Sequence, residues 1–170
     1  MEETAFGAWP AGMGDPMRIN DAFRNDLENS VLCWLATVSE AGTPNVSPKE
    51  IFGLHDDQTL VVADIMSPVT VRNIRTHPIV CVSFVDVFRM RGFKVEGDAA
   101  IVPRDDAAFD EIGGGLLQKA GPDFPIRNAI RIRMTRVSRI LAPSYSLFPH
   151  RSEEERMKSA YATYGVRPMS

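Results

Sequence analysis

The stretch that decides the fold is VLCWLATVSEAGTPNVSPKEIFGL, residues 31–54. Its apolar run at 31–38 is rich in strand-forming residues, and the turn-forming residues SEAGTP follow at 39–44. The segment 45–54 predicts a second strand, which its internal proline assigns to an edge or a bulge. After the turn HDDQ, a third strand is predicted over 59–64. Turns that recur about every 8–12 residues indicate an antiparallel barrel or sandwich.

The rest of the chain continues this pattern with three more strands, predicted over 79–86, over 93–103 with a bulge at Gly97, and over 129–141. Helices are predicted over 20–29, from Ser67-Pro68 to the residue before His77-Pro78, over 104–120, and from Ser152 to Gly165. Ser152 and Glu155 form a capping box, and the glycines at 113–115 are expected to break or kink their helix.

These elements predict a mainly β fold, a small six-stranded antiparallel barrel with peripheral helices. The length of 170 residues fits one domain with short appendages. We expect an N-terminal arm over 1–17, the barrel domain over 18–150, and a C-terminal helix and tail over 151–170. Trp34 and Phe84 lie in apolar strands and are expected in the core.

Composition excludes several classes of protein. Apolar residues make up 44% of the chain and charged residues 24%, as in an ordinary globular domain. The net charge of −3 provides no excess of positive charge that would attract nucleic acid. We expect no membrane segment and a cytoplasmic location, because no long apolar run or secretory signal is present. Cys33 and Cys81 are expected to be reduced, buried thiols.

No catalytic motif with its own nucleophile or metal set occurs in the sequence. His55, His77 and His150 each lie at a turn and are interpreted as solvated rather than as metal ligands. No G-x-S-x-G, G-x-G-x-x-G or phosphate-binding P-loop motif is present. If the protein catalyses a reaction, a cofactor is expected to supply the chemistry.

Residues suited to an anion recur near the ends of the predicted strands, namely Ser47, Lys49, Ser67, Thr70, Arg72 and Asn73. The free amides at a helix N-terminus bind anions, and hydroxyl and cationic side chains add donors. Each residue also has a plainer interpretation. Ser67 could simply cap the helix, Lys49 and Arg72 could be solvated charges, and Asn73 could bond to the backbone.

The order of three segments resembles the pyridoxamine 5'-phosphate oxidase-like family, the FMN-binding split barrels. These segments are LCWLATVSEAGTPNVSPKEIFGL (32–54), TLVVADIMSPVTVRNIRTHPIVCVSFVD (59–86) and GFKVEGDAAIV (92–102). The resemblance implies a homodimeric six-stranded split barrel that holds FMN at the subunit interface. It also implies an oxidoreductase whose flavin accepts a hydride from a small substrate or from NAD(P)H.

The resemblance implies a set of cofactor-binding residues on four segments: Asn45, Val46, Ser47, Pro48, Lys49, Ala63, Asp64, Ile65, Ser67, Thr70, Arg72, Asn73, Phe93 and Lys94. Of these, Ser67 and Thr70 match the phosphate-binding turn, and the segment 92–94 matches a strand that reaches the partner's flavin. The aromatic side chains Phe88 and Phe93 are the expected cofactor or dimer contacts.

Two departures from the oxidase pattern count against oxidation of pyridoxamine phosphate. Pro68, Val69 and Thr70 stand where the oxidase has basic residues, and the C-terminal TYGVRPMS lacks its Trp and Arg-x-His. Three alternatives stay open. One is a split barrel that uses a deazaflavin or haem. The strand motifs contain no histidine, which counts against haem. Another is a flavin carrier or sensor without turnover. Nucleic-acid binding through the arginines of 131–139 is the weakest.

Overall fold

The computed structural model describes residues 19–168, so the predicted arm at 1–17 lies outside the described residues. The elements in chain order are α1 (Asp21–Glu28), β1 (Cys33–Val38), β2 (Pro44–Lys49), β3 (Phe52–Asp56), β4 (Thr59–Asp64), α2 (Pro68–Thr76), β5 (Ile79–Asp86), β6 (Arg91–Pro103), α3 (Phe109–Ala120), β7 (Asn128–Leu141), α4 (Ser144–Leu147) and α5 (Glu153–Tyr164). The prediction of a mainly antiparallel β fold with peripheral helices is confirmed.

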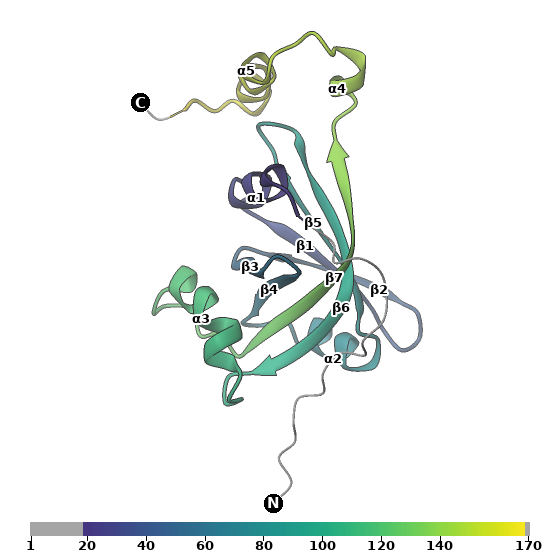
Figure 1. The fold of residues 1–170 in the computed structure, drawn as a ribbon, viewed down its shortest axis with the longest axis vertical. Coiled ribbons are helices and arrows are strands. Elements are labelled where there is room, and N and C mark those ends of the chain that lie inside the picture. Colours follow the sequence, from purple (N-terminus) through teal and green to yellow (C-terminus); the bar gives the residue numbers. More distant parts are fainter. Residues whose placement is uncertain (1–18, 169–170) are drawn as a thin grey trace, which may run out of the picture.

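Seven strands form one antiparallel sheet in the order β2-β1-β5-β6-β7-β4-β3. The two edge strands, β2 and β3, are joined by residues 50–51 alone, so the sheet must curl until its edges meet. The Ala63 amide donates to the Ile51 carbonyl at 2.9 Å and fastens this junction to β4. The long strands β6 and β7 pair along their whole length and connect the two halves of the barrel (Figure 1).

The predicted strand over 45–54 is wrong in one respect, because it is two strands. Lys49 still pairs with Cys33 of β1, whereas Phe52 pairs with Val62 of β4. The chain therefore changes partner across the exposed Glu50, and the barrel has seven strands rather than six. Proline inside the run is confirmed on an edge strand, β2, as its missing N–H requires.

Two apolar cores hold the fold together. The first lies inside the curled sheet and is closed by α1, whose Phe23 ring contacts Phe84 edge-on at 5.2 Å. The second lies under α3, where Phe109 and Leu116 pack on the outer face of β4 and β7. Strand β4 is buried on both faces for this reason, which explains its continuous apolar run.

The glycines at 113–115 were expected to break their helix, and this is wrong: α3 is continuous from 109 to 120. A Cβ at Gly113 would stand 2.8 Å from the Phe109 ring, so the glycine permits close packing. Packing of the apolar face thus outweighs the low helix propensity of glycine. The irregularity predicted at Gly97 is confirmed, because the β6–β7 register shifts between Glu96 and Gly97.

The helix ends mostly follow the predicted caps. Asn20 caps α1, Ser152 and Glu155 form the capping box of α5, and Gly165 ends that helix in the left-handed conformation. Figure 1 shows α4 and α5 beyond the end of the β6–β7 ribbon, at the opposite end of the molecule from α2 and α3. None of the helices within residues 19–168 is long and apolar enough to cross a membrane.

Side chains on the outer face of the sheet differ from expectation. Trp34 was expected in the core, but it lies on the outer face of β1 and is 48% exposed. Phe84 is fully buried as predicted. Cys33 is buried, whereas Cys81, on the outer face of β5, is only half-buried.

Candidate functional site

An open groove of about 360 Å³ lies where β2 ends and α2 begins. Its lining comes from the ends of β2 and β4, from the residue before β1 and from three loops, and consists of Leu32, Ser47, Pro48, Lys49, Glu50, Ile51, Ala63, Ile65, Met66, Ser67 and Phe124. Six of the fourteen predicted cofactor-binding residues are in this set: Ser47, Pro48, Lys49, Ala63, Ile65 and Ser67. The fold therefore brings the predicted segments 45–49 and 63–67 to one site.

Lys49 is the central cation of the groove. Its side chain is buried with 7% of its surface exposed, and its ammonium donates to the Ser67 hydroxyl. Burial lowers the pKa of Lys49 from 10.5, and the nearby Asp64 carboxylate opposes this by favouring the charged form. A partly desolvated cation in an open groove favours an anionic ligand, because a negative group restores the interactions lost on leaving water.

Ser67 was expected to cap α2, but its side chain makes no capping hydrogen bond. The hydroxyl accepts from Lys49, while the Ser67 amide donates to the Asp64 carboxylate at 2.9 Å. The second oxygen of Asp64 accepts from Asn128 at 2.6 Å. Asp64 is thus a buried support that fixes the turn. The first-turn amides of α2 lack intrahelical acceptors, since a helix cannot satisfy its own first donors.

Asn45, Thr70 and Asn73 form a separate cluster with Thr37 and do not line the groove. The Thr37 hydroxyl accepts from Asn45 Nδ2 at 3.2 Å and from Asn73 Nδ2 at 3.1 Å. Asn45 also lies 3.5 Å from the Thr70 hydroxyl. Thr37, Thr70 and Asn73 are buried, so this network joins β1, β2 and α2. The plainer interpretation of Asn73, a structural hydrogen bond, therefore describes its side chain.

Four predicted residues lie elsewhere. Arg72 is on the exposed side of α2, and Val46 is on the outer face of β2. The Phe93 ring is buried in the core, 5.0 Å from the Phe23 ring, and does not line the groove. Lys94 lies on the outer face of β6, 3.4 Å from Glu96.

Sequence reasoning missed five groove residues, namely Leu32, Glu50, Ile51, Met66 and Phe124. Met66 and Phe124 are exposed apolar side chains at the rim, in loops with no hydrophobic periodicity. Phe124 comes from the loop between α3 and β7, which only the fold places beside residues 63–67. Exposed apolar rims of this kind are typical of ligand sites and interfaces.

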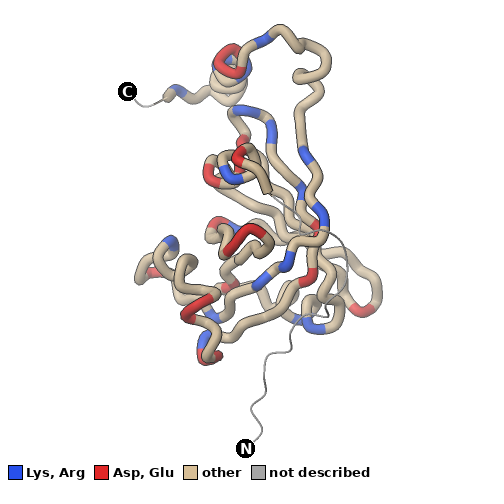
Figure 2. Tube along the Cα trace, viewed as in Figure 1, with Lys and Arg blue, Asp and Glu red and all other residues tan. Residues whose placement is uncertain are grey.

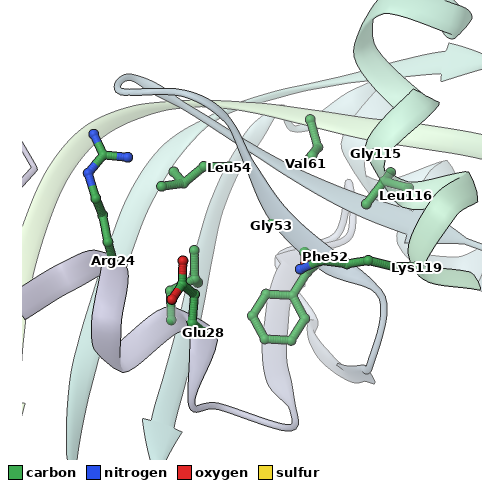
Figure 3. Close-up of a pocket in the computed structure, with 10 residues that line it drawn as sticks. Arg24, Glu28, Phe52, Gly53, Leu54, Val61, Gly115, Leu116 and Lys119 are labelled. Atoms are coloured by element: carbon green, nitrogen blue, oxygen red, sulfur yellow. The ribbon is translucent and has the colours of Figure 1, made fainter. Parts of the chain in front are cut away.

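A second cavity, of about 270 Å³, lies between α1, β3 and α3 and contains none of the predicted site residues. Figure 3 shows Arg24 and Lys119 at its edges. Both cations already have partners, since Lys119 donates to the Phe52 carbonyl at 2.7 Å and Arg24 pairs with Asp57. The groove at Lys49 contains six of the predicted site residues and is therefore taken as the candidate anion site.

Within residues 19–168 few side chains are arranged for acid–base, nucleophilic or metal chemistry. Lys49 and Glu50 are the titratable groups that line the groove there. Burial raises the pKa of the Cys33 thiol to about 12, so Cys33 is not a nucleophile. No cluster of three or more metal-ligating side chains occurs within residues 19–168. Basic positions recur along β6 and β7 (Figure 2), and Arg136 and Arg139 there pair with Glu96 and Asp26.

Comparisons with known proteins agree with this fold. The sequence model of pyridoxamine 5'-phosphate oxidase matches residues 19–140. A search of curated proteins gave no significant match. Similar solved structures include an F420 reductase, with 28% identity and a TM-score of 0.55 over 71% of this chain and 98% of that one.

Two further structures share the fold at 17% identity. An FMN-binding protein from Syntrophomonas wolfei has a TM-score of 0.59 over 71% of this chain and 84% of its own. HutZ, the haem storage protein of Vibrio cholerae, has a TM-score of 0.58 over 74% and 95%. Because the family match spans residues 19–140 of the 170-residue chain, the protein belongs to the pyridoxamine 5'-phosphate oxidase-like family of FMN-binding split barrels.

Proposed function

We propose that the protein is an FMN-dependent oxidoreductase, and that the groove at Lys49 and Ser67 holds the flavin. The observation that carries the proposal is the buried Lys49 ammonium bonded to a serine hydroxyl at the start of α2. Both donors line the open groove, and Ser67 leads directly into α2, whose first-turn amides suit an anion. This set of donors suits a phosphate monoester, which carries about −1.5 to −2 charge near neutral pH.

The rest of the groove suits the flat ring system. Its walls are mainly apolar and come from Pro48, Ile51, Ala63 and Ile65, with Met66 at the rim. Contacts to the phosphate alone scarcely offset the cost of association, estimated at about 4–15 kcal/mol. Burial of the ring must therefore supply much of the affinity. The bound flavin would supply hydride transfer, and the chain would position it and exclude water.

A homodimer belongs to the proposal, because one groove wall of a single chain leaves the ring exposed. The register places Trp34, Val46 and Pro48 on one outer face of the sheet, and Ile79 lies on the same face of β5. Trp34 and Ile79 are 48% and 62% exposed. An apolar face of this kind requires a cover. Pro48 belongs to both the face and the groove, so a partner on this face would also cover the ring.

Lys94 gains a role in this arrangement. It pairs with Ser83, which pairs with Trp34, which pairs with Pro48, so the four residues form one row across the outer face. If a partner subunit packs on that row, the Lys94 side chain lies at the partner's groove and not at the groove of its own chain. We therefore propose that Lys94 reaches the partner's flavin.

The electron donor is proposed to be NAD(P)H or a small neutral substrate rather than pyridoxamine phosphate. Pro68 follows Ser67 directly and brings neither an N–H donor nor a positive charge to the turn. The groove already commits Lys49 to the cofactor phosphate. A second phosphate inside the groove would lack a cation among the lining residues. NAD(P)H needs only its uncharged dihydronicotinamide ring at the flavin, so its phosphates can stay in solvent outside the groove.

A flavin carrier without turnover is the second candidate, and the observation that favours it is the lack of a paired acid and base in the groove lining. The F420 reductase and HutZ have similar folds, and they suggest a deazaflavin or haem as the cofactor in place of FMN. His55, His77 and His150 do not line the groove, which counts against haem as an axially ligated group.

The test is a visible spectrum followed by stopped-flow reduction. The chain is incubated with FMN, freed of unbound flavin by gel filtration, and mixed with NADH or NADPH. An oxidoreductase retains a flavin spectrum and reduces bound FMN faster than free FMN is reduced. Retention of FMN without faster reduction supports the carrier. A protein that retains no FMN overturns both, and a Soret band after haem addition would then favour haem.

A further inference from the structure

The loop between α3 and β7, residues 121–127, carries an aromatic side chain to the groove. Phe124 lines the groove and is 53% exposed. Two residues further on, Ile126 is buried in the core under α3. Ile126 therefore anchors the loop to the barrel, and the Phe124 ring is left facing the groove and the solvent.

The backbone around Phe124 has little freedom to move. Gly121 ends α3 at φ 68°, a left-handed value that suits glycine, and Pro122 follows it directly. Pro125 stands immediately after Phe124, and the ring of each proline fixes its φ near about −65°. A loop restricted in this way loses little conformational entropy when a ligand binds, so its aromatic side chain is preorganised.

Asp64 ties this loop to the cationic end of the groove. The Asp64 carbonyl accepts from the Arg127 amide at 2.8 Å, and its carboxylate accepts from the Ser67 amide at 2.9 Å. Ser67 is three residues after Asp64, and Phe124 is three residues before Arg127. One buried residue thus fixes both the serine assigned to the phosphate and the loop that carries Phe124.

The groove therefore has a polar part and an apolar part. Lys49 and Ser67 supply the donors for an anion, whereas Phe124 and Met66 are apolar side chains, 53% and 79% exposed, on the same groove. Exposed apolar surface gains free energy when a ligand covers it, and a flat aromatic ring is the natural partner of a phenyl ring. A phosphate ester with a planar ring system satisfies both parts at once.

We propose that Phe124 is a ring-contact residue, which packs against the flavin ring from the same chain that holds the phosphate. The proposal rests on the proposed function, because Phe124 contacts a flavin ring only if the groove binds the flavin. It is compatible with the proposed homodimer, since Phe124 lies on none of the strands that form the outer face around Trp34. Ring binding and phosphate binding are thereby assigned to different residues.

The test compares FMN with riboflavin, which has the same ring and no phosphate, on the full chain by flavin fluorescence. Phe124→Ala should weaken the binding of both flavins by the same factor, about 5- to 50-fold, as for the loss of one aromatic contact. Lys49→Met should weaken FMN binding alone. Phe124→Trp restores an aromatic surface and should bind both flavins within about threefold of the wild type.

Phe148→Ala is the matched control, because Phe148 is also an exposed phenylalanine, at 38%, and lies directly after α4, outside the groove. It should leave both affinities unchanged. Phe124→Ala should also keep the wild-type melting temperature without flavin, since its ring is exposed.

Three results would overturn the role of Phe124. They are wild-type affinity of Phe124→Ala for both flavins, a loss of affinity for FMN alone, and a shift of Phe124→Ala toward monomer in sedimentation without flavin. The last result would assign Phe124 to a subunit contact. If the wild-type chain binds neither flavin, the proposed function itself fails, and the role of Phe124 fails with it.

Discussion

Replacing Lys49 by methionine removes the cation that we assign to the cofactor phosphate and keeps a side chain of similar length. Lys49 is 7% exposed, so its interaction with a bound phosphate is poorly screened by solvent. A hydrogen bond to a charged group contributes about 1.5–3 kcal/mol. At about 1.4 kcal/mol for each tenfold change, Lys49→Met should weaken FMN binding by about 10- to 100-fold.

The same substitution should leave the fold intact or stabilise it. Burial lowers the pKa of Lys49, which means that the charged form is less stable in the folded chain than in water. Methionine carries no such cost. Asp64 loses the neighbouring charge but keeps its hydrogen bonds from the Ser67 amide and Asn128. The melting temperature of the variant should therefore equal or exceed that of the wild type.

The assay is quenching of FMN fluorescence on titration with protein near neutral pH. Lys158→Met is the control, because it removes the same charge from an exposed pair with Glu154 on α5. The pH dependence adds a second readout. Because the Lys49 pKa lies below 10.5, wild-type affinity should fall as pH rises before that value is reached, and the Lys49→Met variant should lack this loss. If Lys49→Met binds FMN as tightly as the wild type, the phosphate assignment is wrong.

Three further predictions concern the fold. Gly113→Ala should lower stability by about 1–3 kcal/mol in thermal unfolding, because its Cβ meets the Phe109 ring at 2.8 Å, whereas Gly114→Ala, with open space, should raise it by about 0.5–1 kcal/mol; equal effects would contradict the packing. With a pKa raised to about 12, Cys33 in a Cys81→Ser background, which removes the half-buried second thiol, should not react with Ellman's reagent until guanidinium unfolds the chain, and rapid native reaction would refute its burial. Glu153→Gln should cost less than about 1 kcal/mol, since the carboxylate is 43% exposed beside Arg89. Because its pKa is lowered from 4.5, the stability from Glu153 is present above that pH and is lost as pH falls below it, so a pH-independent difference between wild type and variant would count against the pair.

The sequence predicts the order and type of most elements because their signals are local. Alternation marks 79–86, Asn20 and Ser152 mark helix starts, and Gly165 marks a helix end. The division of 45–54 into two strands could not be predicted in this way, since it depends on which neighbours the two halves meet across the curled sheet. Trp34 reads as a core residue for a similar reason, because periodicity shows the two faces of a strand without showing which one is covered.

The candidate site could be predicted in part, where the anion-binding residues lie on the segments 45–49 and 63–67. Residue type does not separate a ligand from a structural donor, so Asn73 and Thr70 carried the same sequence signal as Ser67. Their burial with Thr37 distinguishes them, and only the tertiary fold shows it. Phe124 is the opposite case, because it carries no local signal and the fold alone brings its loop to the groove.

The most direct test of the account is the affinity of the full chain for FMN compared with riboflavin, which has the same ring and no phosphate. Both are measured by flavin fluorescence under identical conditions. The account predicts that FMN binds at least tenfold more tightly, because Lys49, Ser67 and the start of α2 grip the phosphate. Equal affinity for the two flavins, or no binding of either, would contradict it.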